Sequence, residues 1–198
     1  MKIIVGCELS GRVREAFRKR GHKAWSCDIE PALDGSKYHI QGYIEDHLDD
    51  DWDMGIFFPP CTYLCSSGLH WNKRRPGRAE KTEEALKLVN LLLGCNIDKI
   101  ALENPRGCIG TRIRKSDQVI QPYQFGEDAS KETHIWLKNL PLLVPTLYVP
   151  PRITADGKKR WGNQTDSGQN KLGPSEDRAM LRGLTYQGIA DAMGDQWG

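Results

Sequence analysis

The sequence contains no apolar stretch long enough to cross a membrane. Its hydrophobic runs are short, and the run Leu91–Leu93 is followed at once by Gly94, whereas a membrane-spanning helix needs about 20 predominantly apolar residues. The strand-like Lys2–Val5 stands where a signal peptide would have a basic region and an apolar segment. We therefore expect a cytoplasmic protein.

A strong excess of one charge is also missing. Lys and Arg number 28 and Asp and Glu 26, and hydrophobic residues make up 38%, charged residues 27% and aromatic residues only 8% of the chain. This composition excludes a disordered chain, a collagen-like repeat and a coiled coil. Because 198 residues suffice for one well-filled core, we predict a single domain over residues 1–198.

The six cysteines do not have the pattern of a disulfide scaffold. Cys61 and Cys65, with His70, are the nearest approach to a metal-binding spacing, but Cys95 and Cys108 stand 13 residues apart and supply no second close pair. We therefore predict reduced thiols, of which one is reactive, and no metal site.

Predicted strands and helices alternate along most of the chain. Strands are predicted at 2–7, 23–28, 38–44, 54–58, 99–102 and 134–137, and helices from a cap at Ser10 to Gly21, at 80–95 with Ala85, Leu88, Val89, Leu92 and Cys95 on one face, and at 183–197. Such alternation predicts an α/β fold with a mostly parallel sheet covered by helices on both faces. Residues 145–174 are rich in Pro, Gly and polar residues, which is typical of a loop.

Four polar or reactive clusters follow predicted strands, at the carboxyl ends where parallel sheets bind ligands. They are Gly6–Gly11, Asp28–Glu30, Pro60–Cys65 and Glu103–Pro105. The first is either a ligand-binding loop or an ordinary tight turn, and it lacks the Gly-x-Gly-x-x-Gly spacing of dinucleotide sites. An acidic residue after the second strand commonly accepts hydrogen bonds from a ribose, so the first two clusters together favour a nucleoside-containing cofactor.

The other two clusters carry the candidate reactive groups. Two rigid prolines place Cys61 at a strand end, where it is either a nucleophile or a small buried apolar side chain. Glu103, followed by Asn104 and Pro105, either contacts a base edge and transfers a proton or stands exposed on a capped turn.

These clusters, in this order and on successive predicted strands, resemble the cytosine-5 DNA methyltransferase family. The resemblance covers residues 2–137 and is strongest at Pro60-Cys61 and Glu103-Asn104. It is closest to a short phage and prophage branch, which shares Pro-Pro-Cys-Thr-Tyr-Leu-Cys at 59–65, Gln-Pro-Tyr-Gln-Phe-Gly at 121–126, Tyr-Gln-Gly-Ile-Ala at 186–190 and the final Gln-Trp-Gly. The resemblance implies a Rossmann-like fold that uses S-adenosylmethionine.

The resemblance also implies residue roles. It predicts that Cys61 attacks carbon 6 of cytosine, that Glu103 holds ring nitrogen 3 and the exocyclic amine, and that Lys131 supplies the charge of a family arginine. The cofactor would contact the residues of the first two clusters and the turn before Cys61, namely Gly6, Cys7, Glu8, Ser10, Gly11, Asp28, Ile29, Glu30 and Pro59. A base in duplex DNA must leave the stack to reach such a site.

Three features depart from the family pattern. Tyr43 stands where the family usually has Asp after Gly42, and Lys131 and Thr133 replace two arginines. Residues 144–177 stand in place of a target-recognition domain, which predicts weak sequence specificity. Double-stranded DNA is the expected partner, and the basic stretch after the Cys61 loop predicts contacts from Arg74, Arg75, Arg78 and Arg106, unless these residues form an ordinary solvated face.

Alternatives to DNA methylation stay open from sequence. The same chemistry on a free cytidine nucleotide or on RNA fits the missing recognition domain, and a non-catalytic nucleic-acid-binding relic or a phage decoy fits the fold. A reductase that uses Cys61 and Cys65 lacks the usual Cys-x-x-Cys spacing. Protection of phage DNA from restriction is the role that the resemblance implies, and the oligomeric state is open.

Overall fold

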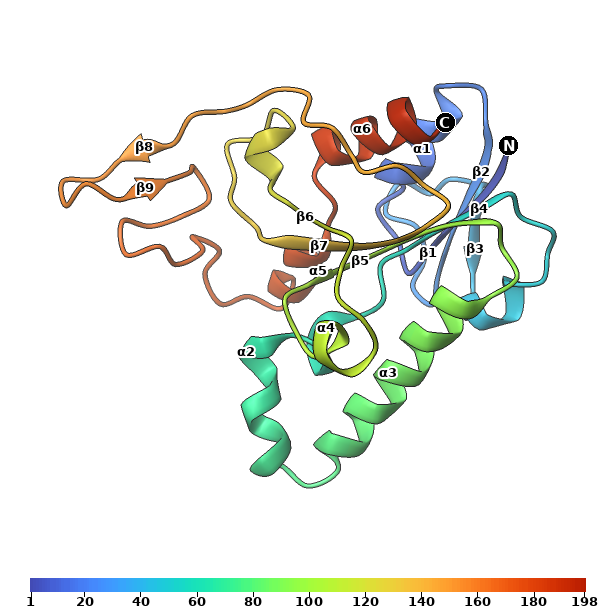
Figure 1. Cartoon of the computed structure of the whole chain (residues 1–198), viewed down its shortest axis with the longest axis horizontal. Coiled ribbons are helices and arrows are strands. Elements are labelled where there is room, and N and C mark those ends of the chain that lie inside the picture. The colour runs from blue at the N-terminus through green and yellow to red at the C-terminus, as the bar shows by residue number, and fades with distance from the viewer.

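A seven-stranded sheet runs through the centre of the computed structural model, which describes residues 1–198 except for the side chain of Ala179 (Figure 1). Its spatial order is β3-β2-β1-β4-β5-β7-β6, and β7 runs antiparallel to both of its neighbours while the remaining pairs are parallel. The strands are β1 (Lys2–Gly6), β2 (Lys23–Asp28), β3 (His39–Gln41), β4 (Met54–Phe57), β5 (Lys99–Pro105), β6 (Gln118–Ile120) and β7 (Thr133–Lys138).

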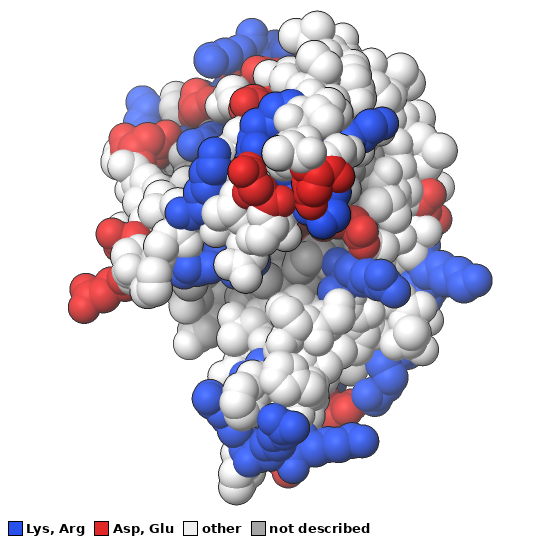
Figure 2. All heavy atoms as spheres, turned by 90° about the vertical axis from the view of Figure 1, so that its left-hand side faces the viewer, with Lys and Arg blue, Asp and Glu red and all other residues white. Residues whose placement is uncertain are grey.

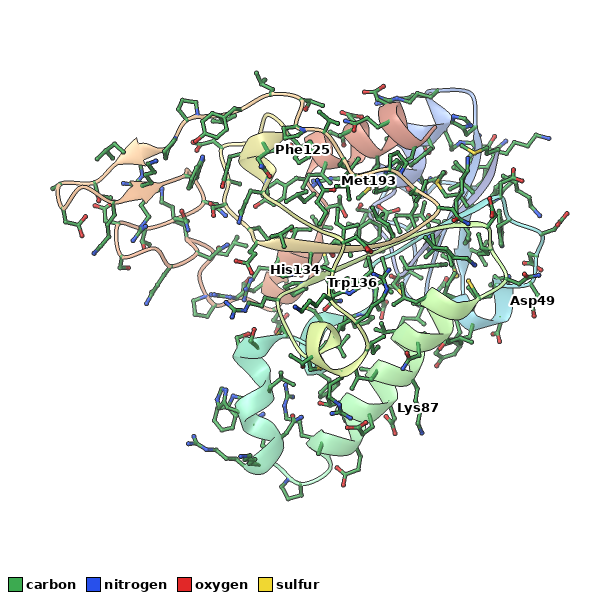
Figure 3. The ribbon with its side chains drawn as sticks, in the orientation of Figure 1. Asp49, Lys87, Phe125, His134, Trp136 and Met193 are labelled. Carbon is green, nitrogen blue, oxygen red and sulfur yellow. The ribbon has the colours of Figure 1, made fainter. Side chains whose placement is uncertain are left out.

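Helices cover both faces of the sheet. The helices α1 (Arg12–Arg18) and α6 (Gln187–Trp197) lie on one face, and α3 (Arg78–Gly94) lies on the other (Figure 1). Alternate residues of β1 serve the two cores, because Ile3 and Val5 pack with α1 and α6 while Ile4 packs with α3. Phe125 and Met193 belong to the core beneath α6 (Figure 3).

This topology confirms the predicted fold class. The sheet is mixed but mostly parallel, it has helices on both faces, and its order reverses at β1, from which the chain leads outward in both directions. The arrangement is that of a Rossmann-like α/β fold. No described helix is both long enough and apolar enough to span a bilayer.

The first helix begins differently from the prediction. Ser10 is not its cap, since the N-cap position is occupied by Gly11 with φ 72°, and α1 ends at Arg18, three residues before Gly21. A left-handed φ at this position suits glycine, and an added Cβ would also meet the side chains of Arg14 and Asp34.

The long helix and one strand also depart from the predicted pattern. In α3 the buried positions are Thr82, Leu86, Val89 and Leu92, whereas Ala85 and Leu88 of the predicted face are half-buried, because the stripe that meets the sheet is rotated by one position. β5 extends three residues beyond the predicted 99–102. Glu103–Pro105 therefore pair with Thr133–Ile135 of β7 instead of forming a turn.

Residues 144–177 are more ordered than the predicted loop. They contain the two-stranded hairpin of β8 (Arg152–Ile153) and β9 (Lys159–Arg160). Trp161 stacks on Tyr123 with ring centroids 4.0 Å apart, and Asn163 exchanges hydrogen bonds of 2.9 Å with the backbone of Ser130. The predicted helix 183–197 begins only at Gln187, as α6, because residues 184–186 are not helical, and a separate short helix, α5 (Arg178–Gly183), precedes it.

The short elements lie mostly near the carboxyl ends of the parallel strands. They are the helices α2 (Ser66–Leu69) and α4 (Ile109–Arg112), with 3-10 turns η1 (Ile44–His47), η2 (Cys61–Tyr63), η3 (His70–Lys73) and η4 (Pro122–Gln124). None of them was predicted, because each has only three or four residues, about one helical turn, which is too few to show an amphipathic pattern.

Candidate functional site

The loops after β1, β2 and β4 meet at one edge of the sheet. Gly6 pairs with Cys27 on one side and with Phe57 on the other. Beyond that point the Glu8 N–H donates to the Cys27 carbonyl oxygen at 3.2 Å, and the Phe58 N–H donates to the Gly6 carbonyl oxygen at 3.0 Å. The predicted cofactor residues of these loops are therefore neighbours in space.

The two glycines of the first loop serve the fold directly. A Cβ at Gly6 would lie 2.7 Å from the Ile44 side chain and 2.8 Å from the Phe57 ring, so glycine there allows core packing. The sequence interpretation, in which Gly6 admits a ligand to the backbone, receives no support from this geometry. Cys7 follows with φ 57°, and burial beside the Asp28 carboxylate raises the pKa of its thiol to about 12. Cys7 is thus a neutral, packed side chain.

Glu8 is the unusual residue of this loop. Its carboxylate is 5% exposed at the entry to α1, one oxygen accepts a hydrogen bond from the Ser10 hydroxyl, and the other, Oε2, is buried without a described partner. Burial raises the pKa of Glu8, while the hydrogen bond from Ser10 and the nearby Arg14 guanidinium oppose the shift. An oxygen left in this condition can accept a hydrogen bond from a bound donor.

The acidic cluster after β2 faces outward. Asp28 is half-buried and accepts the Glu30 N–H at 3.0 Å, while Ile29 is 57% exposed and Glu30 is exposed. This turn holds the half-buried Asp28 carboxylate beside Cys7, and the carboxylate can accept hydrogen bonds from hydroxyl groups. The exposed Ile29 side chain forms an apolar surface next to Asp28.

The Cys61 loop is fastened to the end of β5. Pro59 and Pro60 end β4, since proline cannot donate to a strand ladder, and Cys61 opens the turn η2. The Asn104 side chain donates to the Pro59 carbonyl oxygen at 2.7 Å, and the Cys108 N–H donates to the Leu64 carbonyl oxygen at 2.9 Å. Pro59, predicted to contact the cofactor, is therefore also a support for this loop.

Further hydrogen bonds hold the Cys61 loop against the segment after β5 and against α3. The Ser66 N–H and hydroxyl donate to the Arg106 carbonyl oxygen at 3.0 and 2.7 Å. The Arg78 guanidinium donates to the Thr62 carbonyl oxygen at 2.8 Å and lies 4.8 Å from the centroid of the Tyr63 ring. The structure thus engages Arg78 in holding the Cys61 loop, and its predicted contact with DNA stays a prediction.

The three predicted catalytic side chains come together at this point. The Cys61 thiol is exposed, and the charges of Glu103 and Lys131 both act on it. Glu103 and Lys131 line one small pocket with Phe58, Thr133, Thr185, Tyr186, Ile189 and Met193. Cys61, Glu103 and Lys131 come from three separate parts of the chain, namely η2, β5 and the segment before β7.

Burial raises the pKa of Glu103, while Lys131, a hydrogen bond from Thr133 and His134 lower it by less. A raised pKa favours the protonated carboxyl more than in an ordinary glutamate, and a protonated carboxyl can donate a hydrogen bond as well as accept one. The backbone of Lys131 is held by the Gln121 side chain, which accepts its N–H at 2.9 Å.

Cys61 has a second thiol beside it. The interaction between the two thiols raises the pKa of Cys61, and together with donors from Ser67 and Gly68 it lowers the pKa of Cys65 to about 5. Cys65 is half-buried, and its Sγ lies 3.3 Å from the Ser67 hydroxyl.

The predicted nucleic-acid contacts surround the Cys61 loop. Arg74 and Arg75 are exposed and lie over the Trp71 ring, with guanidinium-to-centroid distances of 5.8 and 4.5 Å. Arg106 is exposed directly after β5. Figure 2 shows Lys and Arg atoms gathered at the lower end of this face, where α2 and η3 lie.

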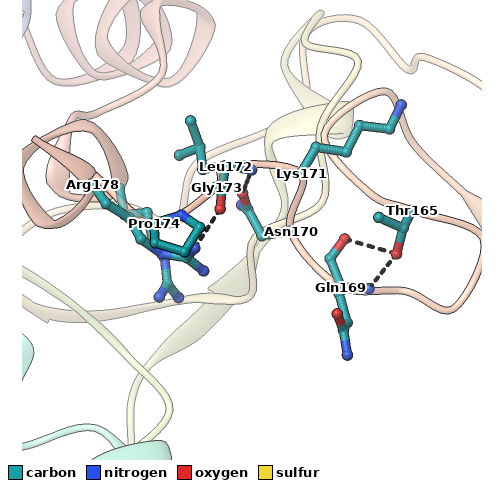
Figure 4. A pocket seen from close by; sticks show the side chains of 9 residues that line it. Thr165, Gln169, Asn170, Lys171, Leu172, Gly173, Pro174 and Arg178 are labelled. Carbon is teal, nitrogen blue, oxygen red and sulfur yellow. Dashed lines mark hydrogen bonds between the residues drawn. The ribbon is translucent and has the colours of Figure 1, made fainter.

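A separate open pocket of about 490 Å³ lies in the C-terminal third of the chain (Figure 4). It is lined by Thr165, Gln169, Asn170, Lys171, Leu172, Gly173, Pro174, Arg178 and Arg182. These residues include none of the predicted site residues, so the pocket is distinct from the Cys61 site.

Sequence reasoning assigned no role to several residues of the site. The resemblance included Tyr186 without a function, and nothing in the sequence pointed to Phe58, Thr185 or Met193. Phe58 reaches the pocket from the end of β4. Thr185, Tyr186 and Met193 reach it because α6 packs on α1, and the Arg12 guanidinium fixes their segment by donating to the Thr185 carbonyl oxygen at 2.7 Å. Among the residues that support the Cys61 loop, Asn104 was indicated by the sequence, because it directly follows Glu103.

Comparison with known proteins adds a distant likeness. No protein-family profile and no curated protein matches the sequence. The chain is similar to the crystal structure of a candidate DNA modification methyltransferase encoded within a prophage of E. coli, with a TM-score of 0.44 and 13% identity over 75% of this chain and 52% of that one. The chain thus spans about half the length of that protein.

Proposed function

We propose that the protein transfers a methyl group from S-adenosylmethionine to carbon 5 of cytosine in DNA through a covalent Cys61 adduct. The observation that carries the proposal is the meeting of the exposed Cys61, the half-buried Glu103 with a raised pKa, and Lys131 at the carboxyl edge of a Rossmann-like sheet. Each of these groups has a separate task in such a reaction.

Methyl transfer to carbon 5 of cytosine requires that the ring first be activated by a nucleophile. Carbon 5 of cytosine is a poor nucleophile, and addition of the Cys61 thiolate to carbon 6 makes it reactive. The Glu103 carboxyl, whose pKa burial raises, forms a hydrogen bond with ring nitrogen 3 as negative charge builds on the ring. Lys131 adds positive charge beside both groups. Loss of the carbon 5 proton and of the thiolate then restores the ring.

The loops after β1 and β2 fit the cofactor, which supplies the methyl group when bound. The buried Oε2 of Glu8 can accept a hydrogen bond from the ammonium group of the methionine part. Asp28 can accept from ribose hydroxyls, and the exposed Ile29 offers apolar contact for the adenine. Ser10 orients Glu8, and Cys7 and the glycines shape the loop.

DNA is the proposed polymer substrate. Arg74 and Arg75 are exposed near Cys61 and can neutralise phosphates, which would make binding strongly dependent on salt. Residues 144–177 form a small hairpin-containing segment in place of a separate recognition domain. We therefore propose weak sequence specificity, limited to a dinucleotide context at most.

Nucleoside mass spectrometry tests the proposal. Cells without cytosine methylation of their own would express the intact protein, a Cys61→Ala variant and, as a matched control, Thr62→Ala, which changes an exposed neighbouring side chain. We expect 5-methylcytosine in DNA from the first and third cultures only, and bisulfite sequencing should show no long consensus. Modification confined to RNA or to free nucleotides would replace DNA as the substrate, and no modified base despite folded protein would refute the reaction.

Replacing Asp28 with alanine should weaken S-adenosylmethionine binding without removing Cys61 reactivity. A lost hydrogen bond to a charged acceptor is worth about 1.5–3 kcal/mol, which corresponds to roughly a tenfold to hundredfold increase in the dissociation constant. Calorimetry of the variant measures it, with Glu84→Ala, which removes an exposed carboxylate of α3, as a control that should leave the dissociation constant unchanged. An unchanged dissociation constant in Asp28→Ala would show that the ribose lies elsewhere.

A further inference from the structure

The turn after β2, which carries the proposed contacts to the nucleoside half of the cofactor, is held by side chains of the edge strand β3. The Nε2 atom of His39 lies 2.9 Å from the Glu30 carbonyl oxygen, and the Gln41 side chain donates to the Ile29 carbonyl oxygen at 3.2 Å. The side chains of Ile29 and Glu30 are themselves exposed, so their own packing holds the turn only weakly. Its backbone therefore depends on these bonds from β3.

A buried arginine stands behind His39. The Arg14 side chain is fully buried, and its Nη1 donates to the Ser26 hydroxyl at 2.7 Å. Its Nε and Nη2 donate to the carboxylates of Glu15 and Asp34. Ser26, which is paired in register with His39 across β2 and β3, is also fully buried, and its hydroxyl lies 2.8 Å from His39 Nδ1. Because all three nitrogens of the buried guanidinium are engaged, Ser26 and His39 are held from a fixed point of the fold.

The direction of these hydrogen bonds follows from the groups at the two ends of the chain. Arg14 can only donate, and the Glu30 carbonyl oxygen can only accept. A neutral His39 therefore has its proton on Nε2, which donates to Glu30, while its bare Nδ1 accepts the hydrogen of the Ser26 hydroxyl. The buried core thus sets the direction in which His39 presents its single N–H.

The same network connects the two loops of the proposed cofactor site. Arg14 belongs to α1, which begins after the loop of Glu8, and its charge acts on the Glu8 carboxylate. Its partner Asp34 lies at the far end of the turn that begins with Asp28. The bond from His39 falls between these two points. Each end of the turn therefore has an anchor of its own, and His39 fixes the course of the backbone between them.

We propose that His39 is a positioning residue for the nucleoside half of S-adenosylmethionine, and that it holds the backbone of Ile29 and Glu30 in its binding conformation before the cofactor arrives. The inference rests on the proposed function, which places the ribose at Asp28 and the adenine at Ile29. A turn that is already ordered loses little conformational freedom on binding, whereas a turn that the ligand must order lowers the affinity.

The same geometry predicts that His39 affects binding and not the transfer step. His39 belongs to the edge strand β3, whereas Glu103 belongs to β5, and three strands, β2, β1 and β4, lie between them. The loss of His39 should therefore raise the dissociation constant of the cofactor and leave kcat at saturating cofactor within about twofold of the intact protein's.

Calorimetry with two ligands tests the inference. S-adenosylmethionine contains both halves of the cofactor, whereas 5′-methylthioadenosine contains the nucleoside half without the amino acid. His39→Ala should raise the dissociation constants of both ligands roughly tenfold, which is the effect of leaving about one backbone residue unfixed. Glu8→Gln should weaken S-adenosylmethionine and leave 5′-methylthioadenosine unchanged, because the proposed partner of Glu8 is the ammonium group.

Two conservative variants separate positioning from a general loss of structure. His39→Gln places an amide N–H near the position of Nε2, so it should restore both dissociation constants to within about threefold of the intact protein's. His39→Asn can meet Ser26 but is too short to reach the Glu30 carbonyl oxygen, so it should behave like His39→Ala. Lys37→Ala, which changes an exposed side chain in the connection before β3, is the matched control and should bind both ligands normally. Circular dichroism shows whether each variant is folded, and His39→Asn serves if His39→Ala does not fold.

The outcomes distinguish this inference from the proposed function. Unchanged dissociation constants in folded His39→Ala or His39→Asn would overturn the inference while the intact protein still binds S-adenosylmethionine. Equal losses in His39→Gln and His39→Asn would also overturn it, because the bond to the Glu30 carbonyl oxygen would then not be the cause. An intact protein that binds neither ligand would refute the proposed function itself.

Discussion

Replacing Cys61 with alanine is expected to abolish methyl transfer while leaving the dissociation constant for S-adenosylmethionine within about twofold of the intact protein's. Without a covalent adduct at carbon 6, carbon 5 of cytosine has too little electron density to accept the methyl group. Cofactor binding should survive because the proposed cofactor residues Glu8 and Asp28 follow β1 and β2, whereas Cys61 follows β4.

Duplex DNA with 5-fluorocytosine gives a direct measurement of the adduct. Fluorine cannot leave carbon 5 as a cation, so a protein that adds Cys61 to carbon 6 and transfers the methyl group should stay bound to the DNA. The intact protein and Thr62→Ala should give a complex stable in denaturing gels, and Cys61→Ala should give none. A stable complex, or residual turnover, in Cys61→Ala would remove the covalent mechanism.

Gly107→Ala is expected to lower both stability and activity, although Gly107 is not a proposed catalytic residue. A Cβ at this position would overlap the Leu64 carbonyl oxygen and lie 2.9 Å from the Cys65 Cα, so the Cys61 loop would have to move away from β5. Overpacking of this kind costs about 1–3 kcal/mol. The displacement would separate Cys61 from Glu103, so methyl transfer should fall more than the fraction of folded protein does.

A neighbouring glycine provides the control for that prediction. Gly110 lies in α4, and a Cβ there meets nothing within 4 Å. Gly110→Ala should therefore be neutral or slightly stabilising, since alanine is the better helix former by roughly 1 kcal/mol. Urea denaturation of both variants measures the difference. Equal denaturation midpoints and activities for Gly107→Ala and the intact protein would show that the contact between the two loops does not hold the site together.

The sheet could be predicted to a large extent because its signals are local. β-Branched and apolar residues at Lys2–Gly6 and Met54–Phe57, bounded by glycine or proline, identify buried strands without reference to the rest of the chain. Parallel strands present their carboxyl ends at one edge. The proximity of the Asp28 and Cys61 loops was therefore foreseeable.

Other features depended on partners far away in sequence. Glu103 looks like part of a turn until β7 pairs with it, and Ser10 looks like a helix cap until Gly11 adopts a left-handed φ. Arg78 belongs to a basic run, yet its guanidinium is engaged by the carbonyl oxygen of Thr62. Residues 144–177 look like a loop but dock through Trp161 and Asn163. No local propensity encodes such contacts.

The sequence by itself determined the α/β class, most of the parallel strands and the polar and thiol side chains that follow them, since residue type and short-range spacing specify strands and turns. Only the tertiary structure decided which of those groups meet. It brought Lys131 and the residues before α6 to Glu103, buried the Glu8 carboxylate, and set Cys65 beside Cys61. The physical reason is that burial, and the pKa shifts that burial causes, arise from packing between segments many tens of residues apart, whereas a sequence pattern records only its own neighbours.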